Sequence, residues 1–192
     1  REREKREQLV RELRDRMPQQ RRRSVELCRQ LNFTEAKLLF TETAEAPDEE
    51  LREWGQAMEN MVDRAEEVYR AVRDGGDVLK GERFAVKGMP QRVEITDVGV
   101  GGISAVFREE VYSHGQFLHE RVEPVTVPFT ELRTPQLLKM AETVFRSQEM
   151  SADEMNLRFG AYVLARGESA QIAQRYLEAT TLSEQAGPLL EE

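Results

Sequence analysis

Two histidines and one cysteine are the residues of this sequence with the most versatile chemistry. His114 and His119 stand five positions apart, with Gly115, Gln116, Phe117 and Leu118 between them. Glutamates that could join them lie nearby in the sequence: Glu109, Glu110 and Glu120. Imidazole and carboxylate groups both bind zinc, but a zinc site needs three or four ligands that converge on one point. Alternation along a strand does not guarantee that these side chains converge. We therefore interpret the histidines as turn and surface residues that flank or occupy a hairpin.

Cys28 is the single cysteine, so an internal disulfide is excluded. A nucleophilic thiol needs a neighbouring base, and both histidines are far from Cys28 in the sequence. The position of Cys28 on the inner face of a predicted helix favours a small buried residue. None of the 36 Asp and Glu residues is marked by spacing as a catalytic pair. The sequence thus predicts no catalytic, cofactor-binding or metal-binding residue, and no enzyme.

The segment Gly99-Val100-Gly101-Gly102 is the densest cluster of glycines. A phosphate-binding loop must lead into a helix, whose free N–H groups meet the phosphate. Here the next residues, Ile103 to Phe107, have the alternation and β-branching of a strand. The glycines therefore predict a hairpin turn, in which they supply positive φ angles.

Aromatic and basic residues interleave in the segment that follows. Phe107, Tyr112 and Phe117 alternate with Arg108 and Arg121. Small barrels bind single-stranded nucleic acid through surfaces of this kind. The chain as a whole carries a net charge of −8, however, and phosphate repulsion would weaken such binding. Nucleic acid is thus a disfavoured partner.

Charge is distributed unevenly along the 192 residues. Residues 1–30 contain eleven Lys and Arg against six Asp and Glu, whereas residues 42–67 contain ten Asp and Glu against two Arg. The two segments could attract each other, or they could be two solvated helix faces. A third reading is that Arg21-Arg22-Arg23 touches nucleic acid or anionic lipid. No apolar run reaches the roughly 18 residues of a membrane helix. The charged start without Met predicts a fragment of a longer chain.

The first 80 residues have the period of helices. Residues 1–20 predict a charged helical arm, with a helix over 2–17 that Pro18 interrupts. Residues 21–80 predict a helical part: a helix over 21–31, a third helix after a break at Asn32-Phe33-Thr34, and a long helix over 47–74 that Asp74-Gly75-Gly76 ends. The Trp54, Met58 and Met61 stripe of the long helix is more typical of a core than of a ligand site.

Residues 81–132 change to the pattern of strands, and residues 133–181 return to helices. Four or five short strands in so few residues predict a small antiparallel barrel of the SH3 or Sm-like kind. Thr134 predicts a helix N-cap with Pro135 at the first helical position, and Ser151 to Glu154 has the spacing of a capping box. Residues 182–192 predict a polar tail. The fold class is therefore α+β, with a small barrel packed with helices.

Two segments of the chain, Val25–Ala44 and Tyr162–Thr181, align with each other without a gap. The matched positions are Leu27 with Leu164, Cys28 with Ala165, Ala36 with Ala173, Leu39 with Tyr176, and Phe40 with Leu177. Each segment predicts a helix, a short break and a second helix with a small residue facing the first. This unit resembles the helical hairpin of tetratricopeptide repeats. A single repeat does not bury its own apolar face, so each hairpin must pack on something else.

The order of these parts, together with Val127–Leu132 and Leu137–Glu142, resembles uncharacterised bacterial regions of large multi-domain proteins, some of them attached to kinases. The resemblance spans roughly residues 21–181. It implies an architecture and no activity. We therefore expect a non-catalytic protein-interaction or scaffold module whose partner, compartment and oligomeric state the sequence does not name. The alternative is a small barrel that binds a peptide or nucleic acid.

Overall fold

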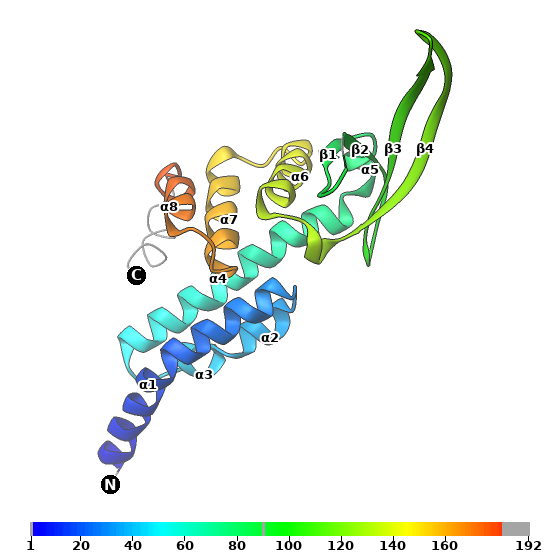
Figure 1. Ribbon diagram of the computed structural model, residues 1–192. Coiled ribbons are helices and arrows are strands. Elements are labelled where there is room, and N and C mark those ends of the chain that lie inside the picture. Colours follow the sequence, from blue (N-terminus) through cyan, green and yellow to red (C-terminus); the bar gives the residue numbers. More distant parts are fainter. Residues whose placement is uncertain (1, 90, 182–192) are drawn as a thin grey trace. The chain divides into compact units, whose positions relative to one another are not determined.

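The computed structural model describes residues 2–89 and 91–181, and it confirms an α+β protein (Figure 1). The predicted tail at 182–192 lies outside the described residues. The chain divides into two compact units. Unit 1 comprises residues 1–68 and 150–192, and unit 2 comprises residues 69–149. Unit 1 is helical in its described residues, whereas the sheet lies in unit 2.

Unit 1 begins with one continuous helix, α1 (Glu2–Arg29). The predicted interruption at Pro18 is wrong, because Pro18 lies inside this helix. Proline has no N–H donor, so the carbonyl four residues earlier loses its hydrogen bond within the helix. Packing on both sides of Pro18 opposes that cost. Before it, Leu13 is fully buried against Ala46 and Leu51, and after it Leu27 and Cys28 are buried. The predicted charged arm is therefore solvated only in part.

Two short helices and one long helix follow α1. They are α2 (Phe33–Leu38), α3 (Thr41–Ala44) and α4 (Glu49–Asp74), so the predicted third helix is divided into two. The Asn32 side chain accepts a hydrogen bond from the Glu35 N–H and so caps α2. Met58 and Met61 of α4 are buried, as their spacing predicts, and the Trp54 ring lies edge-on to Phe40 at 5.5 Å. Residues 49–68 of α4 belong to unit 1 and the remainder to unit 2.

The helices α7 (Ala152–Ala165) and α8 (Ala170–Glu178) form the second hairpin of unit 1. Most of the positions that match in the sequence alignment of the two segments are also buried alike in the two hairpins. Small residues are fully buried at matched positions: Cys28 and Ala36 in the first hairpin, Ala165 and Ala173 in the second. The capping box predicted at Ser151 is confirmed. The two hairpins thus use small residues where their helices meet.

The two hairpins also end their first helices in the same way. Leu31 and Gly167 both have a left-handed backbone, with φ angles of 62° and 58°. In each case the next N–H bonds a carbonyl five residues back: Asn32 bonds Leu27, and Glu168 bonds Val163. This arrangement is a Schellman ending, which reverses the chain without leaving the helix carbonyls unpaired.

Unit 2 holds a four-stranded antiparallel sheet in the order β1-β2-β3-β4. The strands are β1 (Arg83–Ala85), β2 (Arg92–Gly99), β3 (Gly102–Ser113) and β4 (Gln116–Pro128). The predicted SH3-like barrel is wrong, since the sheet is open and β1 does not pair with β4 in the described residues. A three-residue β1 is too short to close a barrel against the thirteen-residue β4.

Helices complete unit 2. They are α5 (Gly76–Leu79), the short 3-10 helix η1 (Phe129–Glu131) and α6 (Thr134–Ser147). The N-cap of α6 is Arg133, so the predicted N-cap at Thr134 is wrong by one residue. One face of the sheet is buried through residues that alternate along the strands: Val93, Ile95, Ile103, Ala105, Phe107 and Val127. Leu137, Met140 and Ala141 of α6 are buried as well. The core of unit 2 therefore lies on one side of the sheet.

The glycine segment at 99–102 is a turn, as its flanking strand patterns predict. Gly99 pairs with Gly102, so the chain reverses through Val100 and Gly101. A Cβ atom on Gly102 would lie only 2.4 Å from the Val127 carbonyl oxygen. The absence of a side chain at Gly102 therefore allows β4 to approach closely.

The β3–β4 hairpin continues well past the rest of the sheet (Figure 1). β2 pairs with β3 only as far as Val106, whereas β3 and β4 stay paired to Ser113 and Gln116. From Phe107 to Ser113 this two-stranded ribbon extends about 20 Å at the usual rise per residue. None of its residues from Arg108 to Val122 is buried.

Candidate interaction surfaces

The two histidines lie in the outer part of the β3–β4 hairpin. His114 and Gly115 form its turn, with φ angles of 51° and 80°, so the predicted second hairpin is confirmed. His119 lies on β4 opposite Val111.

The glutamates near the two histidines have other hydrogen-bond partners. Glu110 accepts from the Tyr112 hydroxyl, and Glu120 accepts from the Arg108 side chain. Across the described residues no group of three or more metal-binding side chains comes together.

Cys28 is fully buried at the packing face of the first helical hairpin. Burial raises the pKa of its thiol to about 11, from an ordinary value of 9.0. At neutral pH the thiol therefore stays protonated and out of contact with solvent. A reactive cysteine has the opposite environment, with a lowered pKa and an exposed sulfur atom.

A polar groove of about 610 Å³ lies between α4 and the start of α7 in unit 1. Four carboxylates line it, and each has a bonding partner. Asp63 pairs with Lys37 at 2.5 Å, and Glu67 pairs with Arg158 at 2.5 Å. Glu154 accepts from Ser151, and Asp153 accepts from Thr181. Burial, with the nearby positive charge of Arg158 second, lowers the pKa of Arg64 in the same groove. These acids therefore join structural elements, in contrast to a free carboxylate pair that shares a proton.

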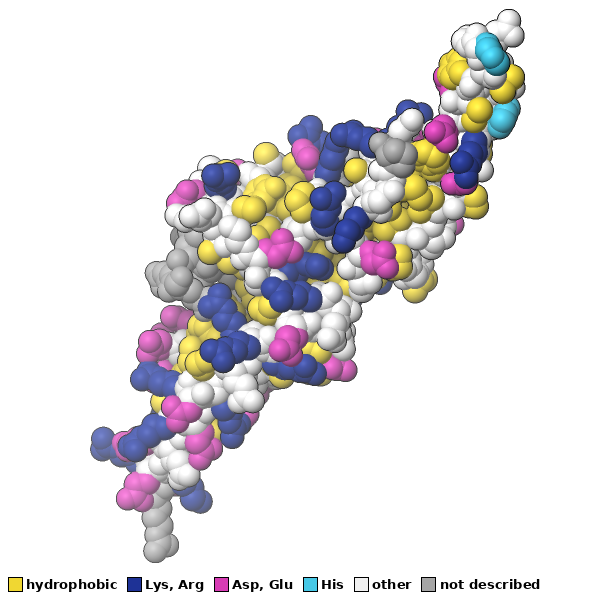
Figure 2. Space-filling view, viewed as in Figure 1, with side chains coloured by type: hydrophobic (Ala, Val, Ile, Leu, Met, Phe, Trp, Pro, Cys, Tyr) yellow, Lys and Arg dark blue, Asp and Glu magenta, His cyan; other side chains and the backbone are white. Residues whose placement is uncertain are grey.

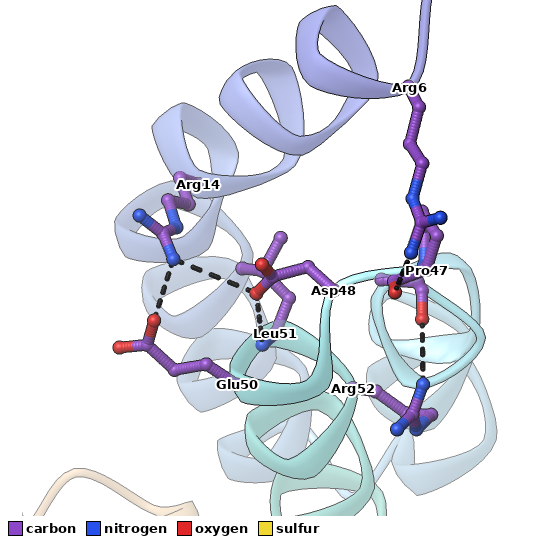
Figure 3. Close-up of polar contacts among 8 residues, drawn as sticks. Arg6, Arg14, Pro47, Asp48, Glu50, Leu51 and Arg52 are labelled. Atoms are coloured by element: carbon purple, nitrogen blue, oxygen red, sulfur yellow. Dashed lines mark hydrogen bonds and ion pairs between the residues drawn. The ribbon is translucent and has the colours of Figure 1, made fainter. Parts of the chain in front are cut away.

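The uneven charge of the sequence produces contacts between α1 and the start of α4 (Figure 3). Arg14 pairs with Glu50 at 2.6 Å and with Asp48 at 3.6 Å. Arg6 donates to the Pro47 carbonyl at 2.7 Å. Of the readings that the sequence allows, the attraction between the basic and acidic segments is the one that the structure supports. Exposed pairs of this kind contribute about 0–1 kcal/mol each, so they orient the helices more than they stabilise them.

The outer end of the β3–β4 hairpin exposes a cluster of large apolar side chains. Tyr112, Phe117 and Leu118 are each 57% exposed. The register of the two strands shifts by one residue between the Val111–His119 pair and the Tyr112–Phe117 pair, so Leu118 is the extra residue of a β-bulge. Alternation from His119 puts Leu118 on the same face as Tyr112. We call Tyr112, Phe117 and Leu118 the hairpin end.

The hairpin end lies on the face of the sheet that is opposite the core. Val111 shares the face of the buried Ile103 and Phe107, so Tyr112 faces the other way. The predicted aromatic surface of Phe107, Tyr112 and Phe117 is therefore wrong at Phe107, which is 4% exposed. Hydrophobic side chains and the two histidines gather at the end of the hairpin, with charged residues next to them (Figure 2).

The exposed ribbon is acidic. Residues 107–123 contain four Glu against two Arg. Both arginines are already paired, Arg108 with Glu120 at 3.1 Å and Arg121 with Glu123. This charge opposes binding to a phosphate backbone, as the sequence predicts for the chain as a whole.

A second candidate surface is an apolar groove of about 180 Å³ at the β1 edge of the sheet in unit 2. Its apolar lining includes Leu79, Phe84, Ile95, Pro135 and Met140. Its charged residues are Glu82, Arg83, Arg92 and Lys139. We call it the β1 groove. Sequence reasoning missed it, because its residues come from 79–95 and 135–143 and only the fold brings them together.

The described helices include none that is long and apolar enough to cross a membrane. Comparisons with protein-family models, with curated proteins and with solved structures find no match to this chain.

Proposed function

We propose that this chain is a non-catalytic protein-interaction module of a larger protein, and that the hairpin end is its contact surface. The observation that carries the proposal is the exposure of Tyr112, Phe117 and Leu118 together at the end of a projecting ribbon. Water contact with three large apolar side chains is unfavourable, and clustered exposure of this kind typically marks a binding surface. Aromatic residues are also the usual anchors of protein interfaces.

The structure of the ribbon supports a protein partner in particular. The β-bulge at Leu118 adds an apolar side chain to the outward face, where it contributes nothing to the core of unit 2. The Tyr112 and Phe117 rings are held edge-on at 5.9 Å, so little side-chain freedom is lost when a partner covers them. Acidic residues beside the cluster favour a partner whose surface is apolar with basic residues around it.

The helical hairpins of unit 1 support the same class of function. Small residues are buried in both pairs, α1–α2 and α7–α8, and this burial supports the tetratricopeptide-like interpretation of their sequences. Stacked helical repeats present extended surfaces that bind proteins. We therefore propose a scaffold role for unit 1 alongside the contact made by the hairpin end.

Affinity isolation with the full chain as bait tests the proposal. The test variant is Phe117→Ser with Leu118→Ser, because both side chains are exposed and the change leaves the buried core intact. Val100→Ser is the matched control, since Val100 is 89% exposed in the other hairpin turn. We expect a defined protein to be retained by the original chain and the control, and its retention to fall about tenfold or more with the double variant. Equal retention by all three baits would contradict the proposal.

A further inference from the structure

The β1 groove and the hairpin end have complementary sizes. Apolar cavities of about 150 Å³ bind one benzene molecule, so a groove of about 180 Å³ accommodates a single aromatic ring. Buried side chains, among them Leu79 and Ile95, form its floor. Phe117 and Tyr112 at the hairpin end each present one such ring.

The two surfaces also have complementary charges. Arg83, Arg92 and Lys139 outnumber Glu82 around the groove, whereas the ribbon from 107 to 123 has an excess of two negative charges. Arg83 is paired with Glu94 at 3.2 Å. Arg92 and Lys139 have no ion pair within the described part of the chain, so their charges are available to an acidic partner. Opposite charges beside an apolar contact fix its orientation and accelerate encounter.

The free edge of β1 argues for an inserted side chain over an added strand. The Gln136 side chain donates to the Ala85 carbonyl, which faces away from β2. Its oxygen accepts from the Arg133 N–H at 2.9 Å, so the amide is held at both ends. A peptide strand that paired with β1 would have to displace Gln136 from the Ala85 carbonyl, whereas an inserted ring needs no hydrogen bond to that carbonyl.

The hairpin end of one chain does not reach its own groove. The groove lies at the β1 edge, and the ribbon extends from β3 and β4, the opposite side of the same sheet. β2 lies between them, and the ribbon continues outward past the end of its pairing with β2 (Figure 1). Contact between the two surfaces therefore requires two molecules.

We propose that the β1 groove binds the hairpin end of a second copy of this chain, an inference that rests on the proposed function and names one partner for it. The contact joins two different surfaces, so each copy offers one hairpin end and one groove. Copies joined in this way form a closed ring if the rotation between neighbouring copies divides a full turn, and an open chain if it does not. A single aromatic anchor predicts weak association, with a Kd of about 10 µM to about 1 mM.

Sedimentation velocity of the full chain over this range of concentrations tests the inference. The hairpin variant is Phe117→Ser with Leu118→Ser, and the groove variant is Arg92→Glu with Lys139→Glu, all at exposed positions. Controls are Val100→Ser and Lys87→Glu, which are exposed residues of unit 2 outside both surfaces. Circular dichroism confirms that each variant is folded.

We expect the original chain and both controls to self-associate, and each surface variant to stay monomeric. An equimolar mixture of the two variants restores one intact contact, because one copy supplies the hairpin end and the other supplies the groove. The mixture should therefore form a dimer. A mixture that stays monomeric, or association that survives in either variant, would overturn the inference.

Failure of this inference and failure of the proposed function give different results. An original chain that remains monomeric up to about 1 mM overturns self-association. The affinity isolation described above then still decides whether the hairpin end binds another protein. If all three baits retain equal amounts of protein and the original chain also stays monomeric in sedimentation, both proposals are overturned.

Discussion

The Tyr112 ring lies edge-on to the Phe117 ring, with the centroids 5.9 Å apart and the planes at 74°. Both residues are 57% exposed, and they lie on a ribbon with no buried residue from Arg108 to Val122. A positive ring edge against a negative ring face is the favoured geometry of an aromatic pair. The pair thus stabilises the end of the hairpin and presents an apolar surface to solvent at the same time.

Phe117→Ala should loosen the outer hairpin without unfolding the protein. An aromatic pair contributes about 0.5–1.5 kcal/mol beyond burial, and none of the residues from 108 to 122 around this pair is buried. Amide hydrogen exchange of residues 108–122 should accelerate accordingly, while the melting temperature changes little. Val100→Ala is the control, and faster exchange throughout unit 2 would contradict the local role of the pair.

Gly55→Ala should destabilise unit 1 although alanine is the better helix former. In an exposed helix the change would gain about 1 kcal/mol. At Gly55 a Cβ atom would lie 2.4 Å from the Ala44 backbone nitrogen, so α3 and α4 would have to separate. Overpacking of this kind costs about 1–3 kcal/mol, and we expect a net loss of unfolding free energy in urea. Gly99→Ala, with open space around it, is the control.

Gly167→Ala should cost about 1–2 kcal/mol of unfolding free energy, for two reasons. The φ angle of 58° is unfavourable for a residue with a side chain, and a Cβ atom would lie 2.7 Å from the Val25 side chain. Val25→Ala in the same background should recover the packing part of the loss and leave the backbone part. Full recovery would show that the backbone conformation adds no strain.

Leu31→Gly, in contrast to Gly167→Ala, should not lower the stability. Leu31 occupies the equivalent ending of the first hairpin with a φ angle of 62°. Glycine removes about 1–2 kcal/mol of left-handed strain at a cost of about 1 kcal/mol in chain entropy and lost contacts. We expect thermal unfolding to show an unchanged or slightly higher melting temperature. A loss as large as that of Gly167→Ala would contradict the Schellman interpretation.

Stability should fall at alkaline pH because two buried groups hold their protons more tightly in the folded state. Burial raises the pKa of Cys28 from 9.0 to about 11 and the pKa of Tyr162 from 10.0 to about 12. A raised folded pKa contributes stability that is complete below the unfolded pKa and is lost as the pH rises through the folded value. Cys28→Ala should therefore flatten the loss between about pH 9 and pH 11. Urea titrations at several pH values measure the unfolding free energy. An equal fall of this free energy with pH in the original chain and in Cys28→Ala would contradict the prediction.

The elements that follow local rules could be predicted from the sequence. The turn at Gly99 to Gly102 has strand patterns on both sides, and Ser151 and Glu154 form a capping box by spacing alone. The small residues Ala36 and Ala173 also show their role, because the two hairpins repeat it. In each case neighbours in the sequence determine the structure.

The elements that depend on distant contacts could not be predicted. Pro18 reads as a break, but the burial of Leu13 against Ala46 and Leu51 keeps α1 continuous. His119, Glu120 and Arg121 are three consecutive polar residues, so no alternation of apolar residues marks this part of β4 as a strand. The wrong prediction of a barrel has the same origin, because it took the single long strand β4 for two short strands. Leu118 joined the candidate surface only through a β-bulge that no spacing rule reveals.

Site-specific photo-crosslinking tests the central claim most directly. A photoreactive residue replaces Phe117 in one protein and Val100 in another, since both positions are exposed in hairpins of unit 2. If the hairpin end is the contact surface, position 117 forms defined protein crosslinks that Tyr112→Ser and Leu118→Ser weaken, and position 100 forms few. Equal crosslinking at the two positions, or no defined product at 117, would contradict it.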